Sequence, residues 1–263
     1  MKTHIHNNLI EFGSHYIEGW CVLDTIGDLS KVEEFLQGQL TSDINVLTNG
    51  SSQLSSICNH KGQVIADVIV YKQEDVFKMI LDKSLVEVFI NELNPFAKFF
   101  STKFDLSNDK VIGRVSKKDN SESSYCSNSA FQLTIELNKE HINHKDTISF
   151  DKWAAANILL GIFFLKKEDS AKYRPLEINY DKLRVSFEKG CYRGQEIVAR
   201  MKYLGVDRRK FCTFITSDVF EHIADIKILG KPIIIDDKKI FNGIIKKDQL
   251  DQLNQISGVI DIY

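Results

Sequence analysis

The chain has 263 residues, of which 43 % are hydrophobic and 27 % are charged, a composition ordinary for a globular protein. Its 17 Phe and 8 Tyr residues exclude disorder as the main state, because a disordered chain carries far less apolar surface. The formal net charge of −2 argues against a strongly basic nucleic-acid binder, although it is compatible with a local basic face. The length fits one large domain or two to three smaller ones.

Cysteine usage and the terminal segment indicate the compartment. The cysteines are widely spaced and form no Cys-x-x-Cys pair: Cys21, Cys58, Cys126, Cys191 and Cys212. This pattern favours free thiols in a reducing compartment over a disulfide framework or a metal site built by this chain alone. Residues 1–10 are polar, and the longest apolar stretch, residues 153–165, is too short to span a bilayer. We therefore expect a soluble, cytoplasmic protein.

The first half of the chain predicts a mixture of strands and helices. Residues 9–23 fit two short strands around Gly13, and residues 28–44 fit a helix with Asp28 or Ser30 as its N-cap. Strands are then expected at residues 53–58, 64–71 and 76–81, with a hairpin turn at residues 59–62. A second helix is expected to begin at Ser84, with Glu87 completing a capping box, and to end or kink at Pro95.

The second half predicts more strands and one further helix before the terminal region. Strands are expected at residues 102–106, 111–116 and 131–137, with an exposed loop at residues 117–129. Residues 151–161 predict a helix with Asp151 as its cap and Gly161 as its stop. Short β runs follow at residues 211–216, 226–229, 233–235, 241–245 and 259–262, with a hairpin turn at residues 236–237. The order of elements predicts an α+β fold with layered antiparallel sheets.

A cysteine between two glycines is the most informative feature of the sequence. Gly190 and Gly194 flank Cys191, and residues 197–202 that follow are helix-like. The positive end of a helix and the neighbouring Lys189 would favour a thiolate, whereas Glu196 opposes it. A turn with a buried structural cysteine is the alternative, because free cysteine is among the most buried residue types. The residues alone leave both interpretations open.

Three stretches together resemble a known family. Residues 189–196 (KGCYRGQE) resemble the signature segment of the YgfZ-type folate-binding proteins, which are relatives of the glycine-cleavage aminomethyltransferase. Members of that family act in iron–sulfur protein maturation and affect tRNA modification. Residues 35–43 (FLQGQLTSD) and 175–179 (PLEIN) agree with the same family, in the same order along the chain. Arg193 departs from the pattern, since the family usually carries Thr there.

The resemblance implies both a fold and a cofactor. The fold would be α+β, with two interleaved ferredoxin-like lobes in a folate-binding body (residues 1–204) and a small C-terminal β-barrel (residues 205–263), arranged as a ring around a central channel. The cofactor would be tetrahydrofolate or a one-carbon derivative. A pterin needs an aromatic clamp and a carboxylate acceptor, and its anionic glutamate tail needs Arg or Lys.

The resemblance also assigns site residues. Cys191 would be the functional thiol, with Lys189 beside it. The expected cofactor-binding residues are Gln39, Asp67, Glu177, Asn179, Tyr192, Gln195, Glu196 and Arg200. Tyr180 is a further candidate for stacking, and Arg184 and Lys202 are candidates for contacts with the tail. Ordinary packing or solvation is the alternative for each of these side chains.

Enzymatic activity of the aminomethyltransferase type is not expected. The related transferases carry an acidic pair in the strand after the hairpin turn, and here Ala66 replaces one member while Asp67 remains. Alanine can neither accept a proton nor stabilise an iminium cation. We therefore expect a folate-dependent assembly factor whose partners are iron–sulfur assembly proteins or client enzymes, with no membrane partner.

Other classes of function are kept as alternatives. A one-carbon transferase is one of them, and a scaffold with a vestigial pocket is another. A tRNA-binding module is a third, because a basic cluster with one aromatic residue lies near the end of the body, at Arg200, Lys202, Tyr203, Arg208, Arg209 and Lys210. A metal site built on histidine is not expected, since the terminal pair His4 and His6 and the loop pair His141 and His144 favour solvated side chains.

Overall fold

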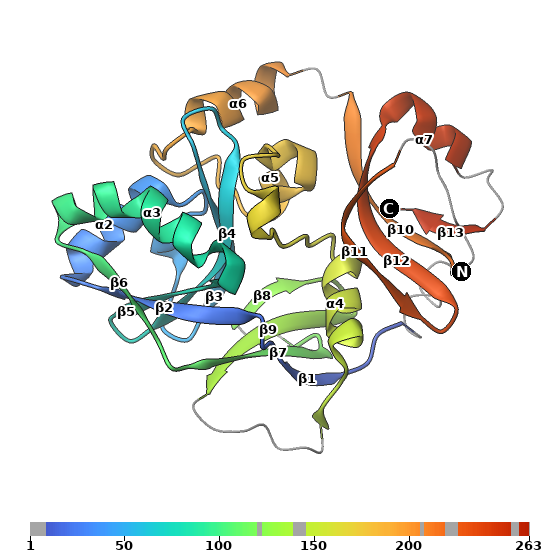
Figure 1. Cartoon of the computed structure of the whole chain (residues 1–263), viewed down its shortest axis with the longest axis horizontal. Helices are drawn as coiled ribbons and strands as arrows, with labels where there is room; N and C mark the ends of the chain where they lie inside the picture. The colour runs from blue at the N-terminus through green and yellow to red at the C-terminus, as the bar shows by residue number, and fades with distance from the viewer. Residues whose placement is uncertain are drawn as a thin grey trace.

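The chain folds into three antiparallel sheets with helices packed around them (Figure 1). The computed structural model describes residues 9–119, 123–138, 146–205, 208–218, 226–253 and 258–262. His4, His6, His141 and His144 lie outside the described residues. No helix in the described part of the chain is long and apolar enough to cross a membrane.

The first sheet has five strands in the order β3-β4-β5-β2-β6. Their bounds are β2 (Trp20–Ile26), β3 (Ser52–Cys58), β4 (Val64–Gln73), β5 (Val76–Asp82) and β6 (Lys103–Leu106). Helices α2 (Leu29–Gln39) and α3 (Val86–Ala97) cover one face, where Phe35, Phe89 and Phe77 join a buried apolar cluster. Burial of these aromatic side chains stabilises the layer by roughly 1.5–3 kcal/mol each.

The second sheet has the order β1-β7-β9-β8 and packs against one helix. Its strands are β1 (Gly13–Tyr16), β7 (Lys110–Lys117), β8 (Ser124–Ser127) and β9 (Phe131–Asn138), and the helix is α4 (Phe150–Leu159). The indole of Trp153 lies directly over the backbone of Gly113, where an added Cβ would be 2.1 Å from Nε1. Only glycine permits this approach, because any side chain at residue 113 would overlap the indole ring.

The third sheet has the order β11-β12-β10-β13. Its strands are β10 (Arg209–Ser217), β11 (Lys227–Ile235), β12 (Lys238–Lys246) and β13 (Val259–Ile262), and the short helix α7 (Lys247–Leu253) follows β12. Ile215, Ile233 and Ile240 of this sheet share one buried cluster with Trp153 of α4. Closure of a barrel and the domain boundary at residue 204 stay predictions.

The connection between α4 and the third sheet carries the predicted signature residues. It forms a 3-10 turn (Pro175–Ile178), the short helix α5 (Tyr180–Leu183) and helix α6 (Gln195–Leu204). In Figure 1, α5 and α6 lie between the hairpin formed by β3 and β4 and the start of β10. This placement brings residues 187–194 against the end of α2 and the turn at residues 59–62.

Several predicted elements are confirmed. Asp28 caps α2 by accepting a hydrogen bond from the Lys31 backbone N–H. Gly62 has φ +67° in the predicted hairpin turn, and Asp236 and Asp237 both have positive φ between β11 and β12. Two consecutive residues with positive φ are the geometry that two-residue hairpin loops favour.

Other predictions about local structure are wrong. Ser84 does not cap α3; Asp82 instead accepts hydrogen bonds from Ser84 in a preceding 3-10 turn. Pro95 does not end α3, because it lies in the last turn and the helix continues to Ala97. Ser149, and not Asp151, caps α4. The region predicted as a loop at residues 117–129 contains strand β8, and the two runs at residues 226–235 form one strand, β11, with a bulge.

Candidate functional site

Cys191 lies exposed on the loop that precedes α6. The other four cysteines are buried or half-buried, and burial raises the pKa of Cys58 to about 12 and the pKa values of Cys21 and Cys126 to about 11. The prediction of a buried structural cysteine at residue 191 is therefore excluded. Cys191 is the thiol in this set that a partner or reagent reaches most readily.

Lys189 anchors the loop and does not reach toward the thiol as a free cation. Its Nζ donates to the carbonyl oxygens of Gln37 and Leu40 at 2.6 Å each and of Ser42 at 3.0 Å. The Gln37 and Leu40 carbonyls lie at the end of helix α2 and the Ser42 carbonyl lies just beyond it, so the ammonium satisfies groups that have no partner within the helix. Burial lowers the pKa of Lys189 to about 8, while the nearby Asp43 carboxylate acts to raise it.

The two residues after Cys191 fix the other side of the loop. Tyr192 is buried, with Lys189 Nζ 5.4 Å from its ring centroid, and burial raises the pKa of its hydroxyl. Arg193, the departure from the family pattern, forms an ion pair with Glu92 of α3 and lies 5.3 Å from the ring centroid of Phe96. Its guanidinium therefore ties the loop to α3.

The second glycine of the motif, Gly194, is required by its backbone conformation and by a close contact. It has φ +83°, and an added Cβ would be 2.4 Å from the backbone oxygen of Asn59 in the β3–β4 turn. By contrast, an added Cβ at Gly190 would meet no atom within 4 Å. The motif thus docks on the hairpin turn through Gly194, on α2 through Lys189, and leaves Cys191 on the surface.

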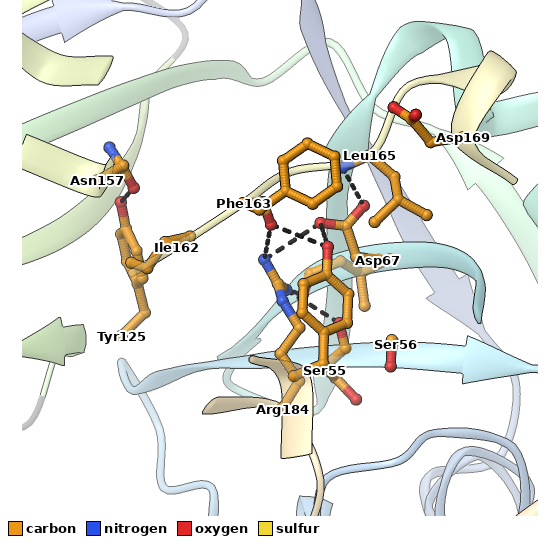
Figure 2. Close-up of polar contacts among 12 residues, drawn as sticks. Ser55, Ser56, Asp67, Tyr125, Asn157, Ile162, Phe163, Leu165, Asp169 and Arg184 are labelled. Carbon is orange, nitrogen blue, oxygen red and sulfur yellow. Dashed lines mark hydrogen bonds and ion pairs between the residues drawn. The ribbon is translucent and has the colours of Figure 1, made fainter. Parts of the chain in front are cut away.

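Asp67 and Arg184 form a buried ion pair (Figure 2). The Asp67 carboxylate is 3.1 Å from the guanidinium and accepts hydrogen bonds from the Tyr180 hydroxyl at 3.0 Å and the Leu165 N–H at 3.2 Å. Burial raises the pKa of Asp67, and the Arg184 charge and both hydrogen bonds oppose that rise. The Arg184 guanidinium also donates to the backbone oxygens of Ser55 and Val68.

This network bears on three predictions, which stay predictions. Asp67 was expected to bind cofactor, Tyr180 to stack on it and Arg184 to hold its tail. Their residue exposures are 3 %, 0 % and 1 %, and each polar head is bonded to protein. The side chains stabilise the interior, because a buried charge requires a partner.

A cavity of about 1190 Å³ lies between α4, the loop before β2 and the edge of β11. Aromatic rings form its walls: Trp20 meets Phe164 edge-on at 4.7 Å and Trp153 edge-on at 5.5 Å, and Trp153 is stacked with Phe164 at 6.3 Å. Arg184 lies 5.0 Å from the centroid of the Phe164 ring. The buried ion pair therefore supports a wall of this cavity.

Charged groups lie at the cavity in addition to the rings. Glu18, Asp151 and Glu168 line it, and within the described residues none of the three makes an ion pair. Lys231 from the bulge of β11 also lines it, and Lys166 does so while paired with Asp82. The cavity thus offers flat aromatic surfaces, carboxylate acceptors and a cation, the combination that a pterin with an anionic tail requires.

The predicted cofactor-binding residues lie outside this cavity. Glu177 accepts a hydrogen bond from the Arg174 N–H at 2.8 Å, and Asn179, with φ +64°, donates to the Gly161 carbonyl. Gln195, Glu196 and Arg200 belong to α6, and Gln39 ends α2. None of the eight lines the cavity described above.

Sequence reasoning missed the cavity residues because their signal is weak. Phe150 and Trp153 have helical spacing, and Phe163-Phe164 lies in an apolar run, which is also how ordinary core residues are arranged. Glu18 lies in a turn and Lys231 in strand β11, far apart in the chain. Only the fold brings them together.

The fold defines the class of this protein. The structure matches that of the glycine cleavage system aminomethyltransferase T from Bartonella henselae with a TM-score of 0.65, at 12 % sequence identity, over 93 % of this chain and 81 % of that chain. A likeness at this identity shows the fold alone. The chain therefore has an aminomethyltransferase-like fold of mixed helices and antiparallel sheets.

Sequence comparison identifies the family within that class. The chain is 30 % identical over 224 residues to the tRNA-modifying protein YgfZ of Buchnera aphidicola subsp. Schizaphis graminum, covering 73 % of this chain and 70 % of that protein. It is 27 % identical over 232 residues to the protein of the same name from Vibrio atlanticus, covering 79 % and 71 %. No family model matches the chain. The chain belongs to the YgfZ family.

Proposed function

We propose that this protein is a tetrahydrofolate-binding accessory factor for the maturation or repair of iron–sulfur proteins, and that it affects tRNA modification indirectly. Membership of the YgfZ family and an aromatic cavity with free carboxylates support this proposal. The relatives are named for tRNA modification. The interleaved lobes, the closed C-terminal barrel and the cytoplasmic location are parts of the same proposal.

The cavity between α4 and β11 is the folate site in this proposal. Trp20, Trp153 and Phe164 supply faces and edges for a flat pterin, and Glu18 or Glu168 accepts its N–H groups. Lys231 holds the anionic tail. When bound, the folate supplies a carrier for one-carbon units. The protein binds and orients it and keeps water from the buried aromatic wall.

Cys191 is the functional thiol in this proposal. It is exposed on a loop that Lys189, Tyr192 and Gly194 fix from three sides, so its position is set before a partner arrives. The described residues contain no group of three or more His, Cys, Asp or Glu side chains that could hold a metal ion. A four-iron cluster needs four ligands, so the remaining ligands come from a partner or client protein.

An accessory role fits the structure better than aminomethyl transfer. Ala66 replaces one acidic residue of the transferase pair, and the Asp67 carboxylate is occupied by Arg184, Tyr180 and Leu165. A carboxylate held in this way is not available as a general base or as a charge beside an iminium cation. The proposal therefore assigns no transferase chemistry to Asp67.

Folate binding is tested by titration of the intrinsic fluorescence. The chain has only two tryptophans, and both line the cavity, so a ligand there quenches the whole tryptophan signal directly. We expect saturable quenching by tetrahydrofolate and at least tenfold weaker binding in a Glu18→Gln/Glu168→Gln/Lys231→Glu variant. Lys98→Glu, at an exposed residue that does not line the cavity, is the control for the reversal of a lysine charge. Absence of saturable quenching in the unaltered protein contradicts the folate proposal.

The thiol is tested by complementation of a deletion strain. Cys191→Ala is expected to abolish complementation without a change in thermal unfolding, because the side chain is exposed. Cys126→Ala is the control, since that thiol is half-buried in β8. A fully active Cys191→Ala protein contradicts the assigned role of the thiol and leaves the folate site untouched.

A further inference from the structure

Basic side chains gather where α6 ends and the third sheet begins. Arg208, Arg209 and Lys210 are exposed at the start of β10. Arg209 is directly opposite Lys246 of β12 in the antiparallel register, and the Lys247 N–H donates to the Arg208 carbonyl at 3.1 Å. The ends of two neighbouring strands therefore present cations to the same edge of the sheet.

The 3-10 turn (Pro175–Ile178) contacts β10, α5 and α6, and so connects this edge of the sheet to both helices. Lys202 of α6 pairs with Asp181 of α5 at 2.9 Å. Burial raises the pKa of the Cys212 thiol, and the positive charges of Lys182 of α5 and Lys210 of β10 both act to lower it. Figure 1 shows α6 and the start of β10 adjoining at the upper edge of the molecule. We call this surface the basic corner, consisting of Lys182, Arg200, Arg208, Arg209, Lys210 and Lys246.

The protein itself leaves the charges of the basic corner largely uncompensated. Within the part of the chain that the structure describes, none of its six members makes an ion pair. Like charges directly opposite each other on two strands, such as Arg209 and Lys246, destabilise the pair. Asp181 is already paired with Lys202, and Glu188, Glu196 and Asp248 are exposed acids in flanking segments of the described chain. An external anion would offset this repulsion.

An exposed aromatic ring lies beside these cations. Tyr203 is 69 % exposed near the end of α6, and its ring meets that of Phe187 edge-on at 6.1 Å. Lys202 Nζ lies 5.2 Å from the centroid of the Phe187 ring on the same side of the chain. Unpaired bases of nucleic acids stack on exposed aromatic rings of this kind, which a neighbouring side chain holds in place beside cations.

We propose that the basic corner binds the phosphate backbone of an RNA and that Tyr203 stacks on one of its unpaired bases. This goes beyond the proposed function, because folate binding neither requires nor predicts such a surface. A nucleic acid is favoured over an anionic membrane because, among the described residues of α6, the exposed large apolar side chains are Tyr203 and Leu204 at its end, and its Val198 is buried. A membrane-binding helix would present a continuous apolar face outward.

The test measures binding of unmodified tRNA to the full chain by fluorescence anisotropy at several salt concentrations. Arg208→Glu/Arg209→Glu/Lys246→Glu is expected to weaken binding more than tenfold and to reduce the slope of log K against log salt by about 2 to 3, since each phosphate contact contributes about 0.9. Tyr203→Ala is expected to weaken binding about fivefold or more with little change in slope. The matched control, Lys98→Glu/Lys117→Glu/Lys118→Glu, carries the same change in charge on other exposed surfaces.

Three results overturn the inference. They are absence of tRNA binding at about 50 mM salt, equal loss in the control variant, or binding to phosphatidylserine vesicles without binding to tRNA. Thermal unfolding of both triple variants checks that they fold, since all six side chains are exposed. Tetrahydrofolate titration of the Arg208→Glu/Arg209→Glu/Lys246→Glu variant is expected to match that of the unaltered protein, so failure of one proposal is distinguishable from failure of the other.

Discussion

Asp67→Asn tests whether the buried ion pair stabilises the body. The substitution keeps the shape of the side chain and an oxygen for the Leu165 N–H, but it leaves the Arg184 guanidinium without its counter-ion. The two groups are 3.1 Å apart, which corresponds to about 5 kcal/mol at an effective dielectric constant of about 20. Removal of one partner of a buried pair costs about 3–5 kcal/mol in other proteins.

We therefore expect Asp67→Asn to lower the free energy of unfolding by about 3–5 kcal/mol, a large part of the roughly 5–15 kcal/mol that a protein of this kind has. Urea unfolding followed by tryptophan fluorescence measures the loss. Lys103→Ala is the control, because it breaks an ion pair with Asp105 in which both side chains are more than half exposed. That loss is expected to be below about 1 kcal/mol.

Arg184→Met removes the other partner of the ion pair. It leaves Asp67 buried without its cation, so the pKa of that carboxyl rises further above its ordinary value. A group that binds its proton more tightly in the folded state stabilises that state as the pH falls. The deficit of Arg184→Met is therefore expected to shrink from pH 7 toward pH 5. Two results would refute the conclusion that Asp67 and Arg184 form a buried ion pair that stabilises the fold. One is a loss of unfolding free energy below about 1 kcal/mol in Asp67→Asn, and the other is a loss in Arg184→Met that does not change with pH.

Three further predictions concern the signature loop. Cys191 is expected to react with a thiol reagent well before the other cysteines, and Cys191→Ser to remove that fast phase; an unchanged fast phase contradicts its exposure. Gly194→Ala is expected to cost more than about 2 kcal/mol in urea unfolding, from positive φ and the clash with Asn59, while Gly190→Ala changes it by less than about 0.5 kcal/mol. Lys189 has a pKa of about 8 when folded, so the unfolded chain binds more protons above that pH. The stability of the unaltered protein relative to Lys189→Met is therefore expected to rise from pH 8 to about pH 10.5, and a flat difference contradicts the burial of the ammonium.

Much of the local structure could be predicted because it depends on neighbours in the chain. Asp28 caps α2 by reaching a backbone N–H three residues away, and Gly62 supplies the positive φ of its turn without help from the fold. The predictions at Ser84 and Asp151 were wrong because two candidates for a cap lay close together. Asp82 accepts a hydrogen bond from the Ser84 backbone N–H, and Ser149 accepts one from the Lys152 backbone N–H. The order of residues does not reveal the geometry of these bonds.

The signature motif could be recognised from the sequence, but the contacts that its side chains make could not. Lys189 was expected beside a reactive thiol and instead ends α2 by bonding to three carbonyls about 150 residues away in the chain. Asp67 and Arg184 are separated in the chain by several strands and helices, and their pairing depends on long-range packing. Residue type identifies a charge, whereas burial decides whether that charge meets a ligand or a protein partner.

By itself, the sequence determined the family, the mixture of helices and antiparallel strands, and the presence of one distinctive cysteine, because motifs and periodicity are local properties of a chain. Tertiary structure alone decided that Cys191 is exposed, that Asp67 is occupied, and that two tryptophans 133 residues apart form one aromatic cavity with Lys231 at its edge. Such assemblies arise from contacts between distant segments, and these contacts are fixed only when the sheets pack together.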